Sequence, residues 1–433
     1  MTAVQKLTAI ETGAEHMSSV HRIALVLAWV TMAGSAIVFT EPAPFDVFGM
    51  GLLVLLPAIG LLRASRALWA YAAVMLVPVA GAFFAILMAI EPPRALTHTA
   101  VTLFLTTISL VLAAFIGRAP VRHARLILSG VTTAAVIAAS AGLAGYLGLF
   151  PRAYELFTLY GRVSGTFKDP NVFGASLVLP AVYLISVLLA PDGRRKGLAL
   201  VAAGLLMLGI LLSFSRGAWF SLVIAAALFG YLSFVTAATS ALRARIVIGF
   251  GGAAVACGLL VTIALQFDAV ADLLSERATL TQSYDEGPEG RFGGQVKAER
   301  LILSHPFGLG AQQFDGYYHV EEAHNVYLTM FMNAGWLGGM IFALMVAVTC
   351  IYGAWFALQR TTVQRMFLVA YAAFVGHALE GFVIDLDHWR HFHLLLALCW
   401  GLMLSDRVPV LVTDLAWPVR VRAARTLAAH IAS

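Results

Sequence analysis

The sequence contains very little charge. Only 12% of its 433 residues are Asp, Glu, Lys or Arg, whereas 60% are hydrophobic and the mean hydropathy is +0.86. Soluble domains carry about 25% charged residues. The polar side chains are too few to cover a water-facing surface, which excludes a soluble globular protein. We therefore expect lipid to surround most of the chain.

Cysteine is also scarce. The three cysteines, Cys257, Cys350 and Cys399, each lie inside an apolar run. Their spacing excludes a disulfide framework and a cysteine-based zinc site, so we expect them to be small buried hydrophobes. The sequence also lacks a clear repeat, a low-complexity stretch and a separate polar domain. It therefore predicts a single membrane domain over residues 1–433.

Long apolar runs are what the chain has in abundance. A helix that crosses a bilayer needs about 20 predominantly apolar residues. These runs predict an all-α polytopic integral membrane protein with about twelve transmembrane helices, centred on residues 23–40, 46–62, 68–90, 98–117, 124–149, 172–190, 197–213, 217–239, 246–267, 326–352, 366–384 and 392–405.

The positive charges predict the orientation of these helices. With both termini in the cytoplasm, 18 of the 28 Lys and Arg residues fall in cytoplasmic segments and 10 fall outside. This excess on the inside is the positive-inside pattern, and it predicts a multi-pass protein of the bacterial inner membrane. The basic pI near 9.2 then follows from topology, and no nucleic-acid partner is expected. We expect the basic tail, 408–433, to lie on the cytoplasmic membrane surface.

Two segments predicted to face outward are longer than the other connections. One covers residues 150–171, and the other covers 268–325, between the ninth and tenth predicted helices. Loops of this length are usually functional or disordered. The larger loop has helical patterns at 268–280 and 295–304. We expect any chemistry to face the periplasm from these two segments.

The first candidate cluster is Arg162, Lys168, Asp169, Pro170 and Asn171. Asp169 is a favoured N-cap residue, and proline suits the first position of a helix. Because a helix N-terminus attracts anions, the two cations beside it make a diphosphate pocket plausible. The alternative is a capped helix whose cations extend to the membrane surface.

The second candidate cluster is the turn that contains Ser215 and Arg216. The acidic residues nearest to Arg216 in the sequence are Asp192 and Asp268. An outward-facing arginine without a neighbouring carboxylate is a functional candidate, and its guanidinium can bind phosphate through two hydrogen bonds. The alternative is an arginine that anchors the helix at the interface.

The third candidate cluster is His324 and Asn325, followed by Gly335, Gly338 and Gly339. The ordinary pKa of histidine, near 6.5, suits a general base at neutral pH. The glycine spacing favours close packing of membrane helices. The alternative for His324 is a structural role at the interface.

The fourth candidate cluster is the segment 385–393, which holds two aspartates, three histidines and Arg390. The spacing fits no pair of helical metal ligands with further ligands on the same face. We therefore expect neither a metal nor a cofactor here, but an aromatic-anchored rim at which Arg390 contacts substrate.

Taken in order, these segments resemble the O-antigen ligase/polymerase membrane family. That family includes O-antigen ligases, polymerases of O-antigen and exopolysaccharide repeat units, and some protein O-oligosaccharyltransferases. The chain departs from the pattern at Val296, where members often have Trp. The stretches that carry the resemblance are 162–171, 215–217, 290–291, 305–310, His324-Asn325 and 335–338.

The resemblance implies a membrane glycosyltransferase that works on the periplasmic face. The implied donor is a glycan on undecaprenyl diphosphate, and the implied acceptor is a glycan, a lipid A–core or a protein side chain. His324 would be the general base, and Arg216 would stabilise the charge that develops on the diphosphate. The other residues that we expect to bind substrate are Arg162, Lys168, Asn171, Ser215, Arg291, Asn325 and Arg390.

A membrane transporter of a small anion or of inorganic carbon shares these sequence features and is the alternative function. A transporter binds its substrate near the bilayer midplane. Mid-span polar residues are few here, for example Asn333, Ser140 and Ser176. The ionisable groups gather at the outer face instead, which favours an enzyme. The sequence leaves ligase and polymerase both open.

Overall fold

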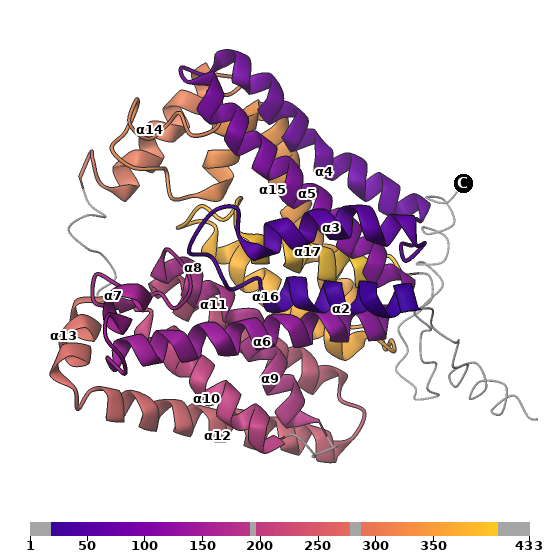
Figure 1. Ribbon diagram of the computed structural model, residues 1–433, viewed down its shortest axis with the longest axis vertical. Helices are drawn as coiled ribbons and strands as arrows, with labels where there is room; N and C mark the ends of the chain where they lie inside the picture. The colour runs from indigo at the N-terminus through magenta and orange to yellow at the C-terminus, as the bar shows by residue number, and fades with distance from the viewer. Residues whose placement is uncertain (1–18, 191–195, 278–286, 406–433) are drawn as a thin grey trace, which may run out of the picture.

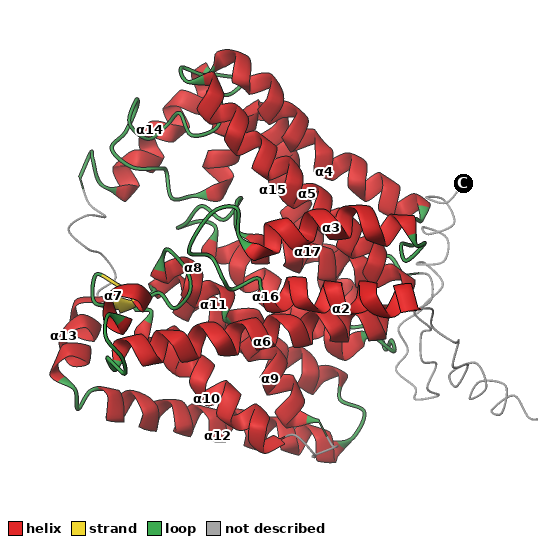
Figure 2. Cartoon of the chain, viewed as in Figure 1, coloured by secondary structure: helices red, strands yellow, loops and turns green. Residues whose placement is uncertain are grey.

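The computed structural model describes residues 19–190, 196–277 and 287–405, and it is mainly helical, as predicted (Figure 1). The predicted basic tail, 408–433, lies outside the described residues. Two short strands, β1 (Thr158–Leu159) and β2 (Arg162–Val163), pair antiparallel (Figure 2). The α-helices are α2 (Ser19–Ala33), α3 (Pro44–Ala58), α4 (Arg66–Ala85), α5 (Pro92–Arg118), α6 (Pro120–Tyr146), α7 (Ala153–Phe157), α8 (Pro170–Ser176), α9 (Val178–Leu189), α10 (Lys196–Leu212), α11 (Arg216–Thr236), α12 (Ser240–Ala264), α13 (Asp268–Arg277), α14 (Arg291–Ser304), α15 (Val326–Ala357), α16 (Gln364–Glu380) and α17 (Arg390–Met403).

Among the described residues, seven helical segments are long and apolar enough to cross a membrane. They are α4 with the following 3₁₀ turn η1 (Ile86–Met88), α5, α6, α8 with α9, α11, α12 and α15. Three further apolar helices, α2, α3 and α10, are shorter. The prediction of a polytopic helical membrane protein is confirmed in this form, and the count of about twelve spans stays a prediction.

The helices pack side by side in a bundle with a continuous apolar interior. The most extensive pairings are α15 with α4, α11 with α16, and α5 with α17. Buried aromatic side chains, including Phe115, Phe374 and Phe392, fill the space between them. In contrast, only 6% of the most apolar stretch of 18 residues in α12 is buried by the rest of the protein. Most of this helix is therefore available for contact with lipid.

One end of the bundle gathers most of the polar connections, and we call it the loop end (Figure 1). It includes α7, α8, α13 and α14 together with the turns 213–215 and 381–389. Helix α14 and the start of α15 enclose a small apolar cluster of their own, Ala298, Leu309, Phe314, Ala323 and Met332. The loop end therefore has a packed interior that holds its side chains in place.

Helix α15 is interrupted at Gly335, where φ is 69° and ψ is −178°. The turn that follows α14 forms backbone hydrogen bonds with α15 on both sides of this break. The backbone N–H of Leu309 donates to Met332 at 2.7 Å, and the N–H of Trp336 donates to the Pro306 carbonyl at 2.9 Å. Gly335 thus interrupts the helix where the turn after α14 packs against it. The sequence analysis expected only close helix packing at this glycine. Close packing is confirmed at Gly338, where an added Cβ would lie 3.4 Å from the Cα of Pro78 in α4.

Gly335→Ala is expected to destabilise the fold by about 2–3 kcal/mol, because alanine rarely adopts this backbone conformation. Its Cβ would also lie 2.8 Å from the carbonyl oxygen of Pro306. Thermal unfolding in detergent measures the effect. Gly204→Ala is the matched control, since nothing lies within 4 Å of its Cβ and alanine favours a helix. Equal unfolding midpoints for the two variants would contradict a strained break at Gly335.

Candidate active site

The start of α8 forms as predicted. Asp169 is the N-cap residue, and its Oδ1 accepts hydrogen bonds from the N–H groups of Asn171 at 2.7 Å and Val172 at 3.2 Å. Pro170 is the first helical residue. The carboxylate thus occupies two of the N–H groups that an anionic ligand would otherwise use.

Arg162 lies inside the loop end, with 8% of its surface exposed. Its Nε donates to the carbonyl of Ser213 at 2.8 Å, and its Nη2 donates to Oδ1 of Asn171 at 2.6 Å. One guanidinium therefore connects the start of α8 to the turn before α11. These contacts bring the first and second candidate clusters together and give Arg162 and Asn171 a structural role.

Lys168 is more exposed and lies 3.3 Å from a carboxylate oxygen of Glu41. Both side chains are more than half exposed, and such surface pairs contribute little to stability. Because that contact costs little to break, Lys168 remains able to meet an anionic ligand.

Arg216 is the first residue of α11. The hydroxyl of Ser215, the N-cap residue, accepts the N–H of Ala218 at 3.3 Å, so this buried side chain serves the helix. A carboxylate does approach the turn, although none is close in sequence. Glu380 of α16 packs so tightly on Gly217 that an added Cβ would lie 2.7 Å from Oε1.

His324 directly precedes α15 and adopts a left-handed backbone conformation, with φ of 48°. Asn325 is the N-cap residue, and its Oδ1 accepts the N–H groups of Tyr327 and Leu328 at 3.1 and 3.3 Å. The N–H of His324 donates to Oδ2 of Asp385 at 3.0 Å. Asn325 therefore orients the loop, and Asp385 holds the backbone of His324.

Two carboxylates flank the imidazole of His324, whose side chain is 29% exposed. Its Nδ1 lies 3.9 Å from Asp385, and its Nε2 lies 3.5 Å from Glu321. Thr329 fixes Asp385 by donating to its Oδ1 at 2.6 Å. Catalytic hydrogen bonds are often long in the free enzyme and shorten when substrate binds. Sequence reasoning did not identify this pair of carboxylates, because Asp385 belongs to a different connection.

Burial is the main cause that lowers the pKa of His324, and the positive charge of Arg291 lowers it further. Glu321 and Asp169 act in the opposite direction. A pKa below the ordinary value of about 6.5 leaves the imidazole neutral at pH 7, the form that accepts a proton. Because their charges act on this imidazole, Arg291 and Asp169 both lie near His324.

Two acidic groups near His324 hold their protons unusually well. Burial raises the pKa of Asp385 to about 7, and it raises that of Glu322 to about 9 with help from the charge of Asp315. Glu322 is therefore protonated at neutral pH. Strong pKa shifts concentrate at functional sites, which supports this region as the reacting centre.

Arg291 is the first residue of α14, and Gly290 is its N-cap residue. The helix begins earlier than the predicted residue 295. Like Arg216, Arg291 stands at a helix N-terminus, where the helix dipole adds to the positive potential. The loop end thus presents two arginines at the starts of two helices.

Arg390, the first residue of α17, forms a two-point ion pair with Asp46 at the start of α3. Its Nε donates to Oδ1 at 2.8 Å, and its Nη2 donates to Oδ2 at 2.6 Å. Both side chains are less than one-fifth exposed. Such a pair fastens α17 to α3, which gives Arg390 a structural partner that the sequence did not indicate.

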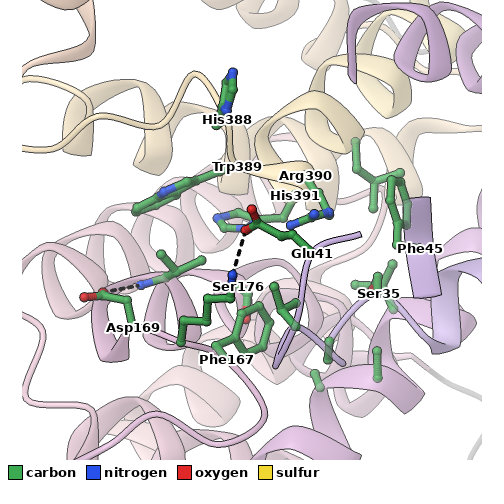
Figure 3. Close-up of a pocket in the computed structure, with 18 residues that line it drawn as sticks. Ser35, Glu41, Phe45, Phe167, Asp169, Ser176, His388, Trp389, Arg390 and His391 are labelled. Atoms are coloured by element: carbon green, nitrogen blue, oxygen red, sulfur yellow. Dashed lines mark hydrogen bonds and ion pairs between the residues drawn. The ribbon is translucent and has the colours of Figure 1, made fainter. Parts of the chain in front are cut away.

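A cavity of about 230 Å³ opens beside the start of α8 (Figure 3). Charged side chains stand on its walls, namely Glu41, Lys168, Asp169 and Arg390, and Trp389 and His391 cover one side. Apolar residues from α6 and α17, including Val131, Ala134, Ala135 and Leu394, line the rest. The cavity can therefore receive a ligand with a polar part and an apolar part.

Within the described part of the chain, one group of side chains has ligand atoms close enough to hold a metal ion. It consists of His98, Asp387 and His388. The sequence analysis expected no metal at the segment that holds Asp387 and His388, because spacing within that segment cannot show that His98 of α5 lies beside it. None of the three belongs to the pair His324 and Arg216 that we expect to be catalytic.

Comparison with known protein families confirms the resemblance. Residues 198–343 match the family model described as O-antigen ligase. The match includes Ser215, Arg216, Arg291, His324 and Asn325, and it ends before Asp385. No curated protein matches the chain. This family implies transfer of a glycan at a membrane.

Proposed function

We propose that this chain, with its O-antigen ligase domain at residues 198–343, is a membrane glycosyltransferase that uses a glycan on undecaprenyl diphosphate. The observation that carries the proposal is the setting of His324. A partly exposed imidazole with a lowered pKa stands between two carboxylates, close to Arg291. A base beside cations is what transfer from a diphosphate to a hydroxyl requires.

In the proposed reaction, the acceptor hydroxyl gives its proton to the neutral imidazole of His324. The hydroxyl oxygen then bonds to the anomeric carbon of the donor sugar. The bond from that carbon to the diphosphate oxygen breaks, and undecaprenyl diphosphate leaves with the bonding electron pair. Asp385 holds the histidine backbone, so the imidazole keeps its place as the proton moves.

Negative charge grows on the diphosphate as the sugar leaves. Arg216 and Arg291 supply positive charge from two helix N-termini, and Lys168 lies at the edge of the neighbouring cavity. Fixed cations stabilise such charge without reorganising. The transfer step therefore uses protein groups alone, with no metal among the reacting atoms. Arg162 and Asn171 support the site by holding the Ser213 turn against α8.

Release of undecaprenyl diphosphate tests the proposed function. Purified protein with a donor that carries an oligosaccharide is expected to release the lipid diphosphate and form a longer or ligated glycan. Repeat units alone as acceptor would indicate a polymerase, and lipid A–core would indicate a ligase. A small-anion transporter, the alternative function, would leave the donor intact, and that result with all acceptors would refute the proposal.

We also propose that the loop end faces the periplasm of an inner-membrane protein. The opposite end carries a cluster of arginines, including Arg63, Arg66, Arg118 and Arg122, as expected for a cytoplasmic surface. An alkaline phosphatase fusion at Gly287 should be active, whereas a fusion at Arg360 should be inactive. The reverse result would place His324 on the side away from a periplasmic donor.

A further inference from the structure

Three side chains from two distant parts of the chain converge beside the proposed active site. His98 lies in α5, whereas Asp387 and His388 lie in the turn between α16 and α17. One possible ligand atom from each residue lies within 4.8 Å of the others. Local spacing in the sequence could not reveal this group, because two ligands come from one turn and the third from another helix.

The carboxylate of Asp387 lacks an adequate partner. The residue is 8% exposed, and Nε2 of His98 lies 3.7 Å from its Oδ2. Among the described residues, no hydrogen bond reaches its carboxylate oxygens; His393 binds only its backbone carbonyl. A buried carboxylate without donors is unfavourable, and a bound cation would remove that penalty.

The two imidazoles lie face to face. The rings of His98 and His388 stack with centroids 3.6 Å apart and an interplanar angle of 17°. Nitrogen ligands on a tetrahedral zinc ion lie about 3.3 Å apart, given a Zn–N distance of about 2.0–2.1 Å. The lone pair of a ring nitrogen lies in the plane of its ring, so one imidazole must turn out of the stack before both nitrogens and the carboxylate can meet one ion.

His388 is also prepared as a ligand. Its Nε2 lies 2.8 Å from the hydroxyl of Thr102, one helical turn after His98 on α5. A hydrogen bond to one ring nitrogen commonly orients a histidine whose other nitrogen binds metal.

We propose that His98, Asp387 and His388 bind one transition-metal dication, with Zn²⁺ as the best match to two imidazoles and a carboxylate. A water molecule would take the fourth position. Of the three residues, His388 also stands at the edge of the cavity of about 230 Å³, above Trp389 (Figure 3).

The metal would hold α5 against the turn that also carries Asp385. It is outside the transfer chemistry, because His324 and Arg216 are not ligands. The proposed metal site is thus additional to the proposed function, and it can be tested independently of glycan transfer. Its role is to keep Asp385 in position against the backbone of His324.

Metal content is the direct test. The full chain is purified in detergent with an affinity tag that contains no histidine and is analysed by mass spectrometry for zinc and other metals. About one zinc ion per chain is expected for the wild type, and at least tenfold less for His98→Gln and Asp387→Asn. His305→Gln is the matched control. It removes one histidine that bonds only near its own helix, to Leu301 and Ser304, and should leave the zinc content unchanged.

A second measurement covers the case in which zinc is lost during purification. Protein stripped with EDTA should bind Zn²⁺ in calorimetry with a stoichiometry of about one, and its unfolding temperature should rise. His98→Gln should show neither effect. Equal zinc binding by the wild type and His98→Gln, or no binding by either, would overturn the proposal. His324→Ala should keep its zinc and lose turnover, which separates this proposal from the proposed function.

Discussion

His324→Ala is expected to lower the turnover of a lipid-linked donor by about a hundredfold or more, the usual loss when a general base is removed. The protein should still fold, because the backbone N–H of residue 324 keeps its bond to Asp385 and Asn325 still caps α15. Donor binding should stay near normal, since the arginines that meet the diphosphate remain. The measurement is release of undecaprenyl diphosphate at saturating donor and acceptor.

The pH profile gives this prediction a second readout. The neutral imidazole is the active form, and burial together with Arg291 lowers its pKa. The wild-type rate should therefore hold steady at neutral pH and fall as the pH drops through a value below about 6.5. His324→Ala should lose that acidic limb. If His324→Ala binds donor weakly but turns over normally at saturation, His324 is a binding residue. If the variant has an unchanged rate, the catalytic centre lies elsewhere.

Arg216→Lys should lose about tenfold or more in turnover, although the charge is kept. A guanidinium offers paired N–H groups that match the oxygens of a diphosphate, whereas an ammonium acts as a point charge. Arg216→Ala should lose about 10²- to 10³-fold, comparable to the removal of one fixed donor in other active sites. The fold should survive, because Ser215 caps α11 with its own hydroxyl.

Arg243→Lys is the matched control for this substitution. Arg243 lies in the first turn of α12, at the opposite end of the bundle, where its Nη2 reaches the carbonyl of Ala237. Its replacement should leave turnover unchanged. If Arg216→Lys also equals the wild type in product formed per minute, then Arg216 anchors the helix and does not contact the diphosphate.

The sequence by itself determined the class of protein and several local features. Low charge and long apolar runs required a membrane environment. Asp169 with Pro170 marked the start of α8, as local hydrogen bonding demands. The order of short motifs indicated the family, since each motif is a local stretch of residues. These features depend on neighbours in the sequence, which is why they could be predicted.

Only the tertiary structure decided the partners of the polar side chains. It placed Asp385 against His324, Asp46 against Arg390, and Ser213 with Asn171 around Arg162. It also brought His98 to Asp387 and His388. Each pairing joins helices or turns that are separate in the sequence, and helix packing, which depends on apolar side chains over the whole bundle, sets which of them meet. Sequence spacing therefore cannot specify which carboxylate or imidazole a given side chain will face.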